Sequence, residues 1–202
     1  MQIYNNQYKD SINFFNNLAS EWDSHYTKKD YEVINKIFSR SKININDKIL
    51  DVASGTGIFT GVLLKNGIKD IVGIDISNKM IDLFRAKYPH LLSINDSFEN
   101  YNFNDMKFDK IIIFNSFPHF KEPQLVFTKS FELLKNTGRL IVAHTMNRDD
   151  LNEHHRNAGR IVEKDVLISN DLFYQYYSSN GFHEVEIENY NYFYSSAIVL
   201  KI

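Results

Sequence analysis

The sequence predicts an α/β protein with an open, mostly parallel seven-stranded sheet, an antiparallel last strand, helices on both faces and two amino-terminal capping helices. From residue 48 onward, short apolar runs of strand length alternate with longer segments that carry apolar residues at helical spacing. Continuous apolar strands are typical of sheets that helices cover on both faces. The turn DVASGTG follows the first run, and in such sheets ligands bind beyond the carboxyl ends of the strands.

Apolar residues at helical spacing predict two helices before the sheet begins. One covers residues 12–22 and the other covers residues 33–38. We therefore expect a single domain over residues 1–202, with a helical cap at 1–40 and a sheet-bearing core at 41–202. A length of 202 residues agrees with this, because it suffices for one full core but not for two comfortable ones.

Turn and capping residues separate the strands and helices of the core. Gly67 is a C-cap for the first core helix, Ser77 caps the second and Pro89 stops it. Pro123 suits the first turn of the third helix, and Gly181 ends the last one. The predicted core helices are 57–66, 78–88, 123–135, 148–158 and 171–180. The predicted strands are 48–53, 70–75, 91–94, 108–115, 138–145, 182–189 and 192–201.

The last two strands lie close together in the chain, so we expect them to be antiparallel neighbours. In the first of them, Val185 and Ile187 alternate with Glu184, Glu186 and Glu188. This period of two predicts a strand with one face in solvent.

Composition limits the classes of function. The net charge is -2 and the isoelectric point is about 6.4, which argues against nucleic acid as the main partner. The absence of cysteine excludes disulfides, thiolate metal sites and cysteine nucleophiles. The polar amino terminus and the lack of any membrane-length apolar run predict a cytoplasmic protein that does not associate with membranes. The oligomeric state is not predicted.

The loop after the first strand suggests a nucleotide-like ligand. Gly55 and Gly57 allow a ligand to approach the backbone closely, and Asp75 ends the next strand, where a carboxylate can accept from both ribose hydroxyls. A dinucleotide site needs G-x-G-x-x-G, but its third glycine would fall on Thr60. The negative charge of the Asp51 carboxylate inside this turn would also repel a pyrophosphate, whereas it would attract an ammonium group. A ligand with adenosine at one end and an amino acid at the other would suit both carboxylates, and S-adenosylmethionine (SAM) is such a ligand.

The segment LDVASGTGIFT followed by VGIDIS resembles the first two motifs of the class I SAM-dependent methyltransferase superfamily, which has a Rossmann-like fold. The likeness is greatest to the small-molecule, ubiquinone-biosynthesis-like branch, methyltransferase type 11. It extends from the second amino-terminal helix to the last strand. It implies methionine contacts from Asp51, Ser54, Gly55 and Gly57, a ribose contact from Asp75, an adenine sandwich of Ile76 and Met80, and adenine-amino contacts from Asp96 with Ser97 beside it.

The segment FFNNLASEWDSHYTKK is similar to the helix that closes over SAM in this branch. The resemblance implies that Trp22 and Tyr26 shield the sulfonium or line the acceptor pocket. Packing of the cap is the alternative for Trp22. Ala53 departs from the pattern, since many relatives carry glycine there, and we expect it to narrow the loop slightly.

The acceptor side is predicted at NSFPHF, residues 115–120, where the fourth strand ends. The motif N-P-P-F of amino-methylating enzymes that act on nucleic acid is absent, because the prolines are not adjacent. Asn115 is expected near the methyl group, with His119 and His144 as candidate catalytic residues. An imidazole can serve as a general base near neutral pH.

Four histidines at this edge also permit a divalent metal site, formed by His119, His144, His154 and His155. His154 and His155 point about 100° apart on a helix, so only one of them is expected to face the site. Three further residues, Arg148, Asn152 and Asp165, are candidates to orient a substrate, although a charged helix face explains them equally well.

These observations predict a SAM-dependent methyltransferase for a small-molecule acceptor with a histidine-lined site. The alternative is a SAM-binding and metal-binding sensor or accessory protein without transferase activity. A nicotinamide-dependent dehydrogenase is a third interpretation, which Asp51 and the misplaced third glycine disfavour.

Overall fold

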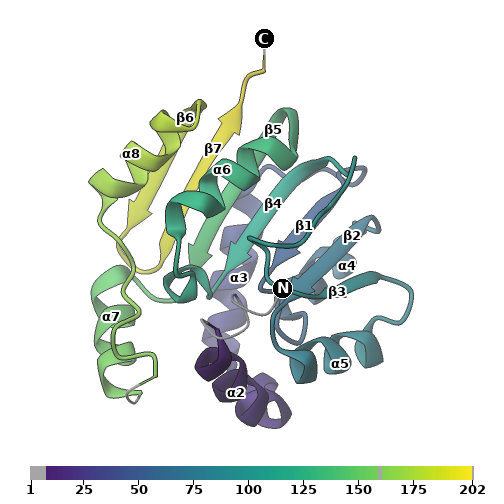
Figure 1. The fold of residues 1–202 in the computed structure, drawn as a ribbon, viewed down its shortest axis with the longest axis vertical. Coiled ribbons are helices and arrows are strands. Elements are labelled where there is room, and N and C mark those ends of the chain that lie inside the picture. Colours follow the sequence, from purple (N-terminus) through teal and green to yellow (C-terminus); the bar gives the residue numbers. More distant parts are fainter. Residues whose placement is uncertain (1–7, 159–160, 202) are drawn as a thin grey trace.

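The computed structural model describes residues 8–158 and 161–201 and shows one seven-stranded sheet in the order β3-β2-β1-β4-β5-β7-β6 (Figure 1). The strands are β1 (Ile49–Val52), β2 (Ile71–Asp75), β3 (Leu92–Asn95), β4 (Phe108–Phe114), β5 (Leu134–His144), β6 (Phe182–Asn189) and β7 (Phe193–Val199). The α-helices are α2 (Lys9–Leu18), α3 (Lys28–Arg40), α4 (Ile58–Lys65), α5 (Asn78–Lys87), α6 (Pro123–Leu133), α7 (Arg148–Asn157) and α8 (Asn170–Ser179). Two 3-10 helices are η1 (Ala19–His25) and η2 (Phe117–His119).

The predicted sheet is confirmed. β1 pairs in parallel with β2 and β4, β2 with β3, and β4 with β5. β7 runs antiparallel to both β5 and β6. Most boundaries differ by one or two residues, and the largest difference among the strands is at β5, which begins at Leu134 rather than 138. Leu134 is fully buried and pairs with Phe108 across a register irregularity, so α6 ends at Leu133 rather than at 135. The division into cap and core stays a prediction.

Two apolar cores lie on opposite faces of the sheet, because neighbouring residues of a strand point to opposite sides. On β4, Ile111 and Ile113 join the core formed with α6 and α8. Ile112 and Phe114 join the core formed with α3 and α4. Helices on both faces leave the carboxyl ends of the parallel strands as the accessible edge. None of the described helices is long and apolar enough to cross a membrane.

The amino-terminal cap, residues 8–26 with α2 and η1, is hydrogen-bonded to the loops that follow β1 and β2. Thr56 in the loop after β1 donates its hydroxyl to Asp23 at 2.5 Å. Ser77 after β2 donates to Oδ1 of Asn16 at 2.7 Å. Each of these contacts joins the cap to a loop that the sequence assigns to the cofactor.

The cap also contacts the loops after β3 and β4. The hydroxyl of Tyr8 donates to Oε1 of Glu99 at 2.5 Å. The amide of Asn115 donates to the hydroxyl of Tyr26 at 3.4 Å. The cap therefore lies across the strand ends and encloses the space above them.

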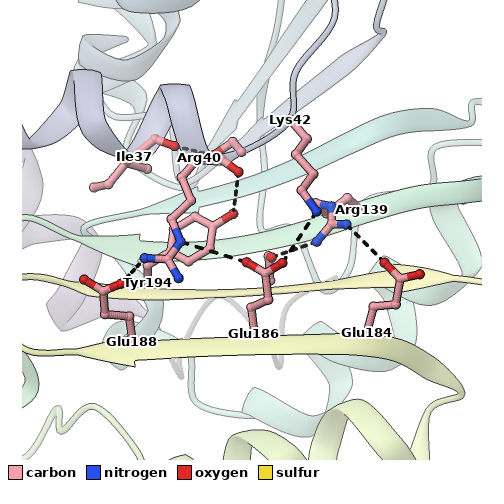
Figure 2. Close-up of polar contacts among 10 residues, drawn as sticks. Ile37, Arg40, Lys42, Arg139, Glu184, Glu186, Glu188 and Tyr194 are labelled. Carbon is pink, nitrogen blue, oxygen red and sulfur yellow. Dashed lines mark hydrogen bonds and ion pairs between the residues drawn. The ribbon is translucent and has the colours of Figure 1, made fainter.

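Strand β6 is the edge of the sheet farthest from β3. Three of its glutamates form ion pairs with the basic side chains of Arg40, Lys42 and Arg139 (Figure 2). Arg40 at the end of α3 pairs with Glu188, and its guanidinium lies 4.7 Å from the ring centroid of Tyr194. Lys42 pairs with Glu186 at 3.6 Å. Charged side chains on an edge strand oppose pairing with a further chain, so this face protects the sheet edge. It does not take part in the site described below.

Gly57 sets how closely the loop after β1 approaches α5. Its φ is +86°, and a Cβ there would lie 2.5 Å from the ring of Tyr88 and 2.9 Å from Phe84. The hydroxyl of Tyr88 donates to the Gly57 carbonyl at 3.0 Å. Gly57 thus serves packing between the loop and α5.

Gly57→Ala should lower the free energy of unfolding by about 2–5 kcal/mol, the sum of a left-handed alanine at about 1–2 and overpacking at about 1–3. Urea denaturation measures this. Gly67→Ala is the matched control, because Gly67 has φ +88° but its Cβ would meet only the flexible end of Ile45 at 3.1 Å. Equal losses in the two variants would show that contact with Tyr88 and Phe84 is unimportant.

Candidate active site

A cavity of about 760 Å³, including its open mouth, lies between the cap and the ends of β1, β2 and β4. The sheet side contributes residues that end these strands or follow them: Asp51, Ala53, Ser54, Gly55, Asp75, Ile76, Phe114, Asn115 and Ser116. The cap contributes Tyr8, Phe15, Trp22 and Tyr26. Ile58, Phe59, Met80, Glu99, His119 and Phe120 complete the lining.

Two buried carboxylates lie at the inner end of the cavity. Oδ2 of Asp51 accepts from the Thr60 hydroxyl at 2.6 Å. Burial raises the pKa of Asp51 to about 7, and the nearby charge of Asp75 adds to the rise. Burial also raises the pKa of Asp75 to about 6, against the effect of its backbone hydrogen bonds. Two acids with raised pKa values form a site that a cation would stabilise in the ionised form.

Asp75 organises the backbone around it. Its two carboxylate oxygens accept from the N–H groups of Gly55 and Ser77, each at 2.8 Å. The Ser77 hydroxyl in turn accepts from Met80 N at 3.2 Å and caps α5, as the sequence predicts. One carboxylate therefore joins the glycine loop to the start of α5.

Two serine hydroxyls in the lining have no hydrogen-bond partner among the described residues. Ser54 Oγ and Ser116 Oγ are both buried. Ser54 follows β1 and Ser116 follows β4, so the hydroxyls come from two different loops. Buried polar atoms are nearly always hydrogen-bonded, so these two hydroxyls are candidates to bind a polar ligand or a water molecule.

The backbone is strained at two points of the lining. Ala53 has φ +52° and Asn115 has φ +53°, both in the left-handed region that side chains disfavour. Asn115 is held there by its Oδ1, which accepts from Thr145 N at 2.9 Å. The departure at Ala53 therefore concerns backbone conformation rather than the width of the loop. Such strain clusters at functional sites.

Most of the predicted cofactor residues come together in this lining. Trp22 lies beside the glycine loop, since a Cβ on Gly55 would be 3.6 Å from the indole nitrogen. Tyr26, Ile76 and Met80 line the same cavity. Burial raises the pKa of Tyr26 to about 12.

Three predicted cofactor residues are not among the lining residues. Gly57 faces α5, as described above. Asp96 accepts from Ser97 N at 2.7 Å, and the Ser97 hydroxyl accepts from the amide of Asn100 at 2.7 Å. Asp96 and Ser97 thus form a local turn after β3.

His119 lines the cavity, and its Nδ1 lies 2.8 Å from Oδ2 of Asp165. Lys121 contacts the other oxygen of Asp165 at 3.2 Å. The ring of Phe15 from the cap packs edge-on against the imidazole, with centroids 5.1 Å apart. His119 is therefore held between a carboxylate and an aromatic ring.

His144 takes a different position from the one expected of a catalytic base. It is 1% exposed, does not line the cavity, and neither ring nitrogen has a partner among the described residues. Burial lowers the pKa of His144 to about 3, with smaller effects from His119 and His155. A neutral imidazole of such low basicity is a poor proton acceptor near neutral pH.

The helix α7 places His155 inward and His154 outward. His155 is 6% exposed and its ring centroid lies 5.0 Å from that of His119, whereas His154 is exposed. Within residues 8–158 and 161–201, no group of three or more His, Asp or Glu side chains is arranged to hold a metal ion. The metal interpretation therefore has no support from the described residues.

Comparison with known families decides the class of protein. A family model described as a methyltransferase domain, type 11, matches residues 50–142, from β1 into β5. The matched part of the chain, residues 50–142, is similar to the methyltransferase type 11 domain of class I SAM-dependent methyltransferases.

Two curated relatives agree with this assignment. An uncharacterized methyltransferase of Oceanobacillus iheyensis is 28% identical over 146 residues, which is 68% of this chain and 68% of the relative. The ubiquinone/menaquinone biosynthesis C-methyltransferase UbiE of Wigglesworthia glossinidia brevipalpis is 35% identical over 107 residues, 49% of this chain and 43% of the relative. The chain thus spans about two thirds of one relative and less than half of the other.

A solved structure shows the same fold over nearly the whole chain. It is the methyltransferase in a complex with the Haloferax volcanii Trm112 methyltransferase activator, at a TM-score of 0.77 and 16% identity. The match covers 93% of this chain and 98% of that chain. The predicted methyltransferase fold is confirmed.

The methyl donor of this family is SAM, and the residues of the cavity fit it. SAM carries an ammonium group and two ribose hydroxyls, and carboxylates such as those of Asp51 and Asp75 can accept hydrogen bonds from both. Its polar groups can supply partners for the unpartnered hydroxyls of Ser54 and Ser116.

Several lining residues of the methyltransferase were not predicted. Ser116 lies inside NSFPHF, next to Asn115. A second polar residue at this strand end is a sequence signal that could have predicted its place in the lining. Glu99 follows Asp96 by three residues, and Tyr8 and Phe15 belong to the cap. Their place in the lining depends on how the cap docks, which has no local sequence signal.

The pH dependence of stability tests the raised pKa of Asp51. The ordinary pKa of an aspartate is 3.8, and the pKa of Asp51 in the fold is about 7, so between these values the folded protein holds more protons than the unfolded chain. The stabilising contribution is complete below the lower value and is lost as pH rises through about 7. We expect the ligand-free methyltransferase to lose thermal stability over this window, and Asp51→Asn to lose less.

Asp105→Asn is the matched control, because Asp105 is exposed in a turn far from the cavity. Melting temperatures recorded across the window measure the slope. The same slope in wild type and Asp51→Asn would contradict the raised pKa.

A second experiment tests the strain at Ala53. Ala53→Gly should raise the free energy of unfolding by about 0.5–1 kcal/mol, because glycine relieves a left-handed alanine but adds entropy to the unfolded chain. Ala143→Gly is the control, since Ala143 is buried in β5 and its φ is not positive. Urea denaturation should show opposite signs for the two variants, and a loss of stability in both would refute the strain.

Proposed function

We propose that this protein transfers the methyl group of SAM to a small molecule bound beside it, under the amino-terminal cap. The observation that supports this best is the composition of one cavity: its lining holds the buried carboxylates of Asp51 and Asp75 with the unpartnered hydroxyl of Ser54, and it also holds a histidine with aromatic rings. The first group suits the charged donor and the second group suits an acceptor.

On the donor side, Asp51 faces the ammonium and Asp75 the ribose hydroxyls. Ser54 and Gly55 contribute a hydroxyl and close backbone approach. Ile76 and Met80 supply apolar surface for the adenine. These roles follow from the motif resemblance together with the positions of the residues in the lining.

The acceptor side favours a small and largely apolar molecule. Phe15, Trp22 and Phe120 line it with aromatic surface, and no Lys or Arg is found in the lining that the structure describes. A polyanionic nucleic-acid backbone would need such cations. The relative named UbiE is a C-methyltransferase of ubiquinone/menaquinone biosynthesis, which also supports a small-molecule acceptor.

Methyl transfer needs alignment, exclusion of water and, for a protic acceptor, removal of a proton. SAM supplies an electrophilic methyl group when bound. The cap excludes water, Asn115 lies at the end of β4 beside the cavity, and His119 accepts the proton. We assign no proton transfer to His144, because it is buried behind the cavity with a pKa of about 3.

Asp75→Asn and His119→Ala should separate binding from chemistry. Asp75→Asn should weaken SAM binding about 10- to 100-fold, because two charge-assisted hydrogen bonds and a ribose contact are lost. His119→Ala should retain SAM affinity and lower turnover about 10²- to 10⁴-fold. Calorimetry with SAM measures the first effect. Formation of S-adenosylhomocysteine with a panel of small phenols, amines and thiols measures the second.

His154→Ala is the matched control, since this histidine lies on the exposed face of α7 and should change neither quantity. Absence of SAM binding in the wild type would overturn the proposed function. Equal losses of SAM affinity in Asp75→Asn and His119→Ala would overturn the division of roles.

A further inference from the structure

The segment between α7 and α8, residues 161–169, brings a buried carboxylate to the acceptor side of the cavity. Asp165 in this segment is 7% exposed. Its backbone carbonyl lies 2.5 Å from Nδ1 of His155 on α7. Because a carbonyl only accepts hydrogen bonds, Nδ1 of His155 carries the proton of this contact.

Two more side chains of α7 hold the same segment. Oδ1 of Asn152 accepts from Leu167 N at 2.8 Å, and Nε of Arg148 donates to the Ile168 carbonyl at 2.7 Å. A segment without helix or strand is thus fixed to α7 at three points. Arg148, Asn152 and His155 therefore anchor this segment, and they are not part of the cavity lining.

The side chain of Asp165 is fixed at both oxygens. Oδ2 lies 2.8 Å from Nδ1 of His119, and Oδ1 lies 3.2 Å from Nζ of Lys121. Burial opposes ionisation of this carboxyl, but the hydrogen bond from His119, together with the charge and hydrogen bond of Lys121, holds the pKa of Asp165 below its usual range. The carboxylate is therefore ionised and can only accept hydrogen bonds.

These contacts determine which ring nitrogen of His119 carries the proton. A neutral imidazole has one donor nitrogen and one acceptor nitrogen. With an ionised carboxylate 2.8 Å from Nδ1, the proton lies on Nδ1 and the lone pair on Nε2. His119 lines the cavity and Asp165 does not, so Nε2 is the nitrogen left for a bound acceptor.

We propose that Asp165 is a positioning residue for methyl transfer, holding His119 in the Nδ1-protonated tautomer so that Nε2 takes a proton from the acceptor. The proposal rests on the proposed function and narrows its substrate class to acceptors that carry an ionisable proton, such as a hydroxyl, an enol or a primary or secondary amine. The acceptor atom bonds to the methyl carbon as the sulfur–carbon bond breaks. The electron pair of the broken bond stays on sulfur, and the acceptor's proton goes to Nε2.

The tautomer can be measured without knowing the acceptor. Long-range ¹H–¹⁵N spectra of histidine-labelled protein distinguish Nδ1–H from Nε2–H rings, and the His119→Asn variant assigns the signal. We expect His119 to be the Nδ1–H tautomer in wild type. Asp165→Asn should shift it toward Nε2–H, because an amide can donate to Nδ1. Lys121→Met, which keeps the carboxylate, should retain the Nδ1–H form.

The kinetic arm uses the acceptor found with the panel of phenols, amines and thiols. Asp165→Asn should lower kcat at least tenfold while the SAM dissociation constant stays within twofold of wild type. Lys121→Met should lower kcat less. Asp171 is an acidic residue in the first turn of α8. Asp171→Asn should leave both kcat and the SAM dissociation constant unchanged.

A wild-type His119 in the Nε2–H form would overturn the proposal even if Asp165→Asn failed to fold or no acceptor were found. An Asp165→Asn variant with normal kcat would overturn it as well. Loss of SAM binding by the wild type would instead count against the proposed function, so the two failures are distinguishable.

Discussion

The carboxylate of Asp75 is the contact on which the site depends. It accepts from Gly55 in the loop after β1 and from Ser77 at the start of α5, each at 2.8 Å. Ser77 then caps α5 and donates to Asn16 of the cap. Loop, helix and cap are thereby connected through a single buried acid, whose burial raises its pKa to about 6. A cation bound beside it would favour the ionised form that these donors require.

The cap and the sheet edge form a second connected unit. Each of four loops at the strand ends is hydrogen-bonded to the cap, through Thr56, Ser77, Glu99 and Asn115. Because these loops also line or adjoin the cavity, the position of the cap and the shape of the cavity depend on each other. Binding of a ligand beneath the cap is therefore expected to stabilise all four contacts together.

Three histidines in or near the cavity lining, His119, His144 and His155, differ in chemistry because their surroundings differ. His119 faces an ionised carboxylate and the cavity. His155 contacts a backbone carbonyl, and burial lowers its pKa. His144 has neither partner, so burial lowers its pKa furthest. Counting imidazoles at one sheet edge suggested a metal site, but the ring nitrogens of His119 and His155 are directed at Asp165 instead.

The sequence by itself determined the sheet, its helices and the common location of Asp51, Ser54, Gly55 and Asp75 at one sheet edge. These depend on local patterns: apolar runs of strand length, capping residues and a glycine turn that directly follows a strand. Only the tertiary structure decided that Gly57 packs against α5, that His155 rather than His154 faces inward, and that Asp165 reaches His119 across 46 residues. Contacts between distant segments depend on how the cap and the segment after α7 dock, and docking has no local periodicity to reveal it.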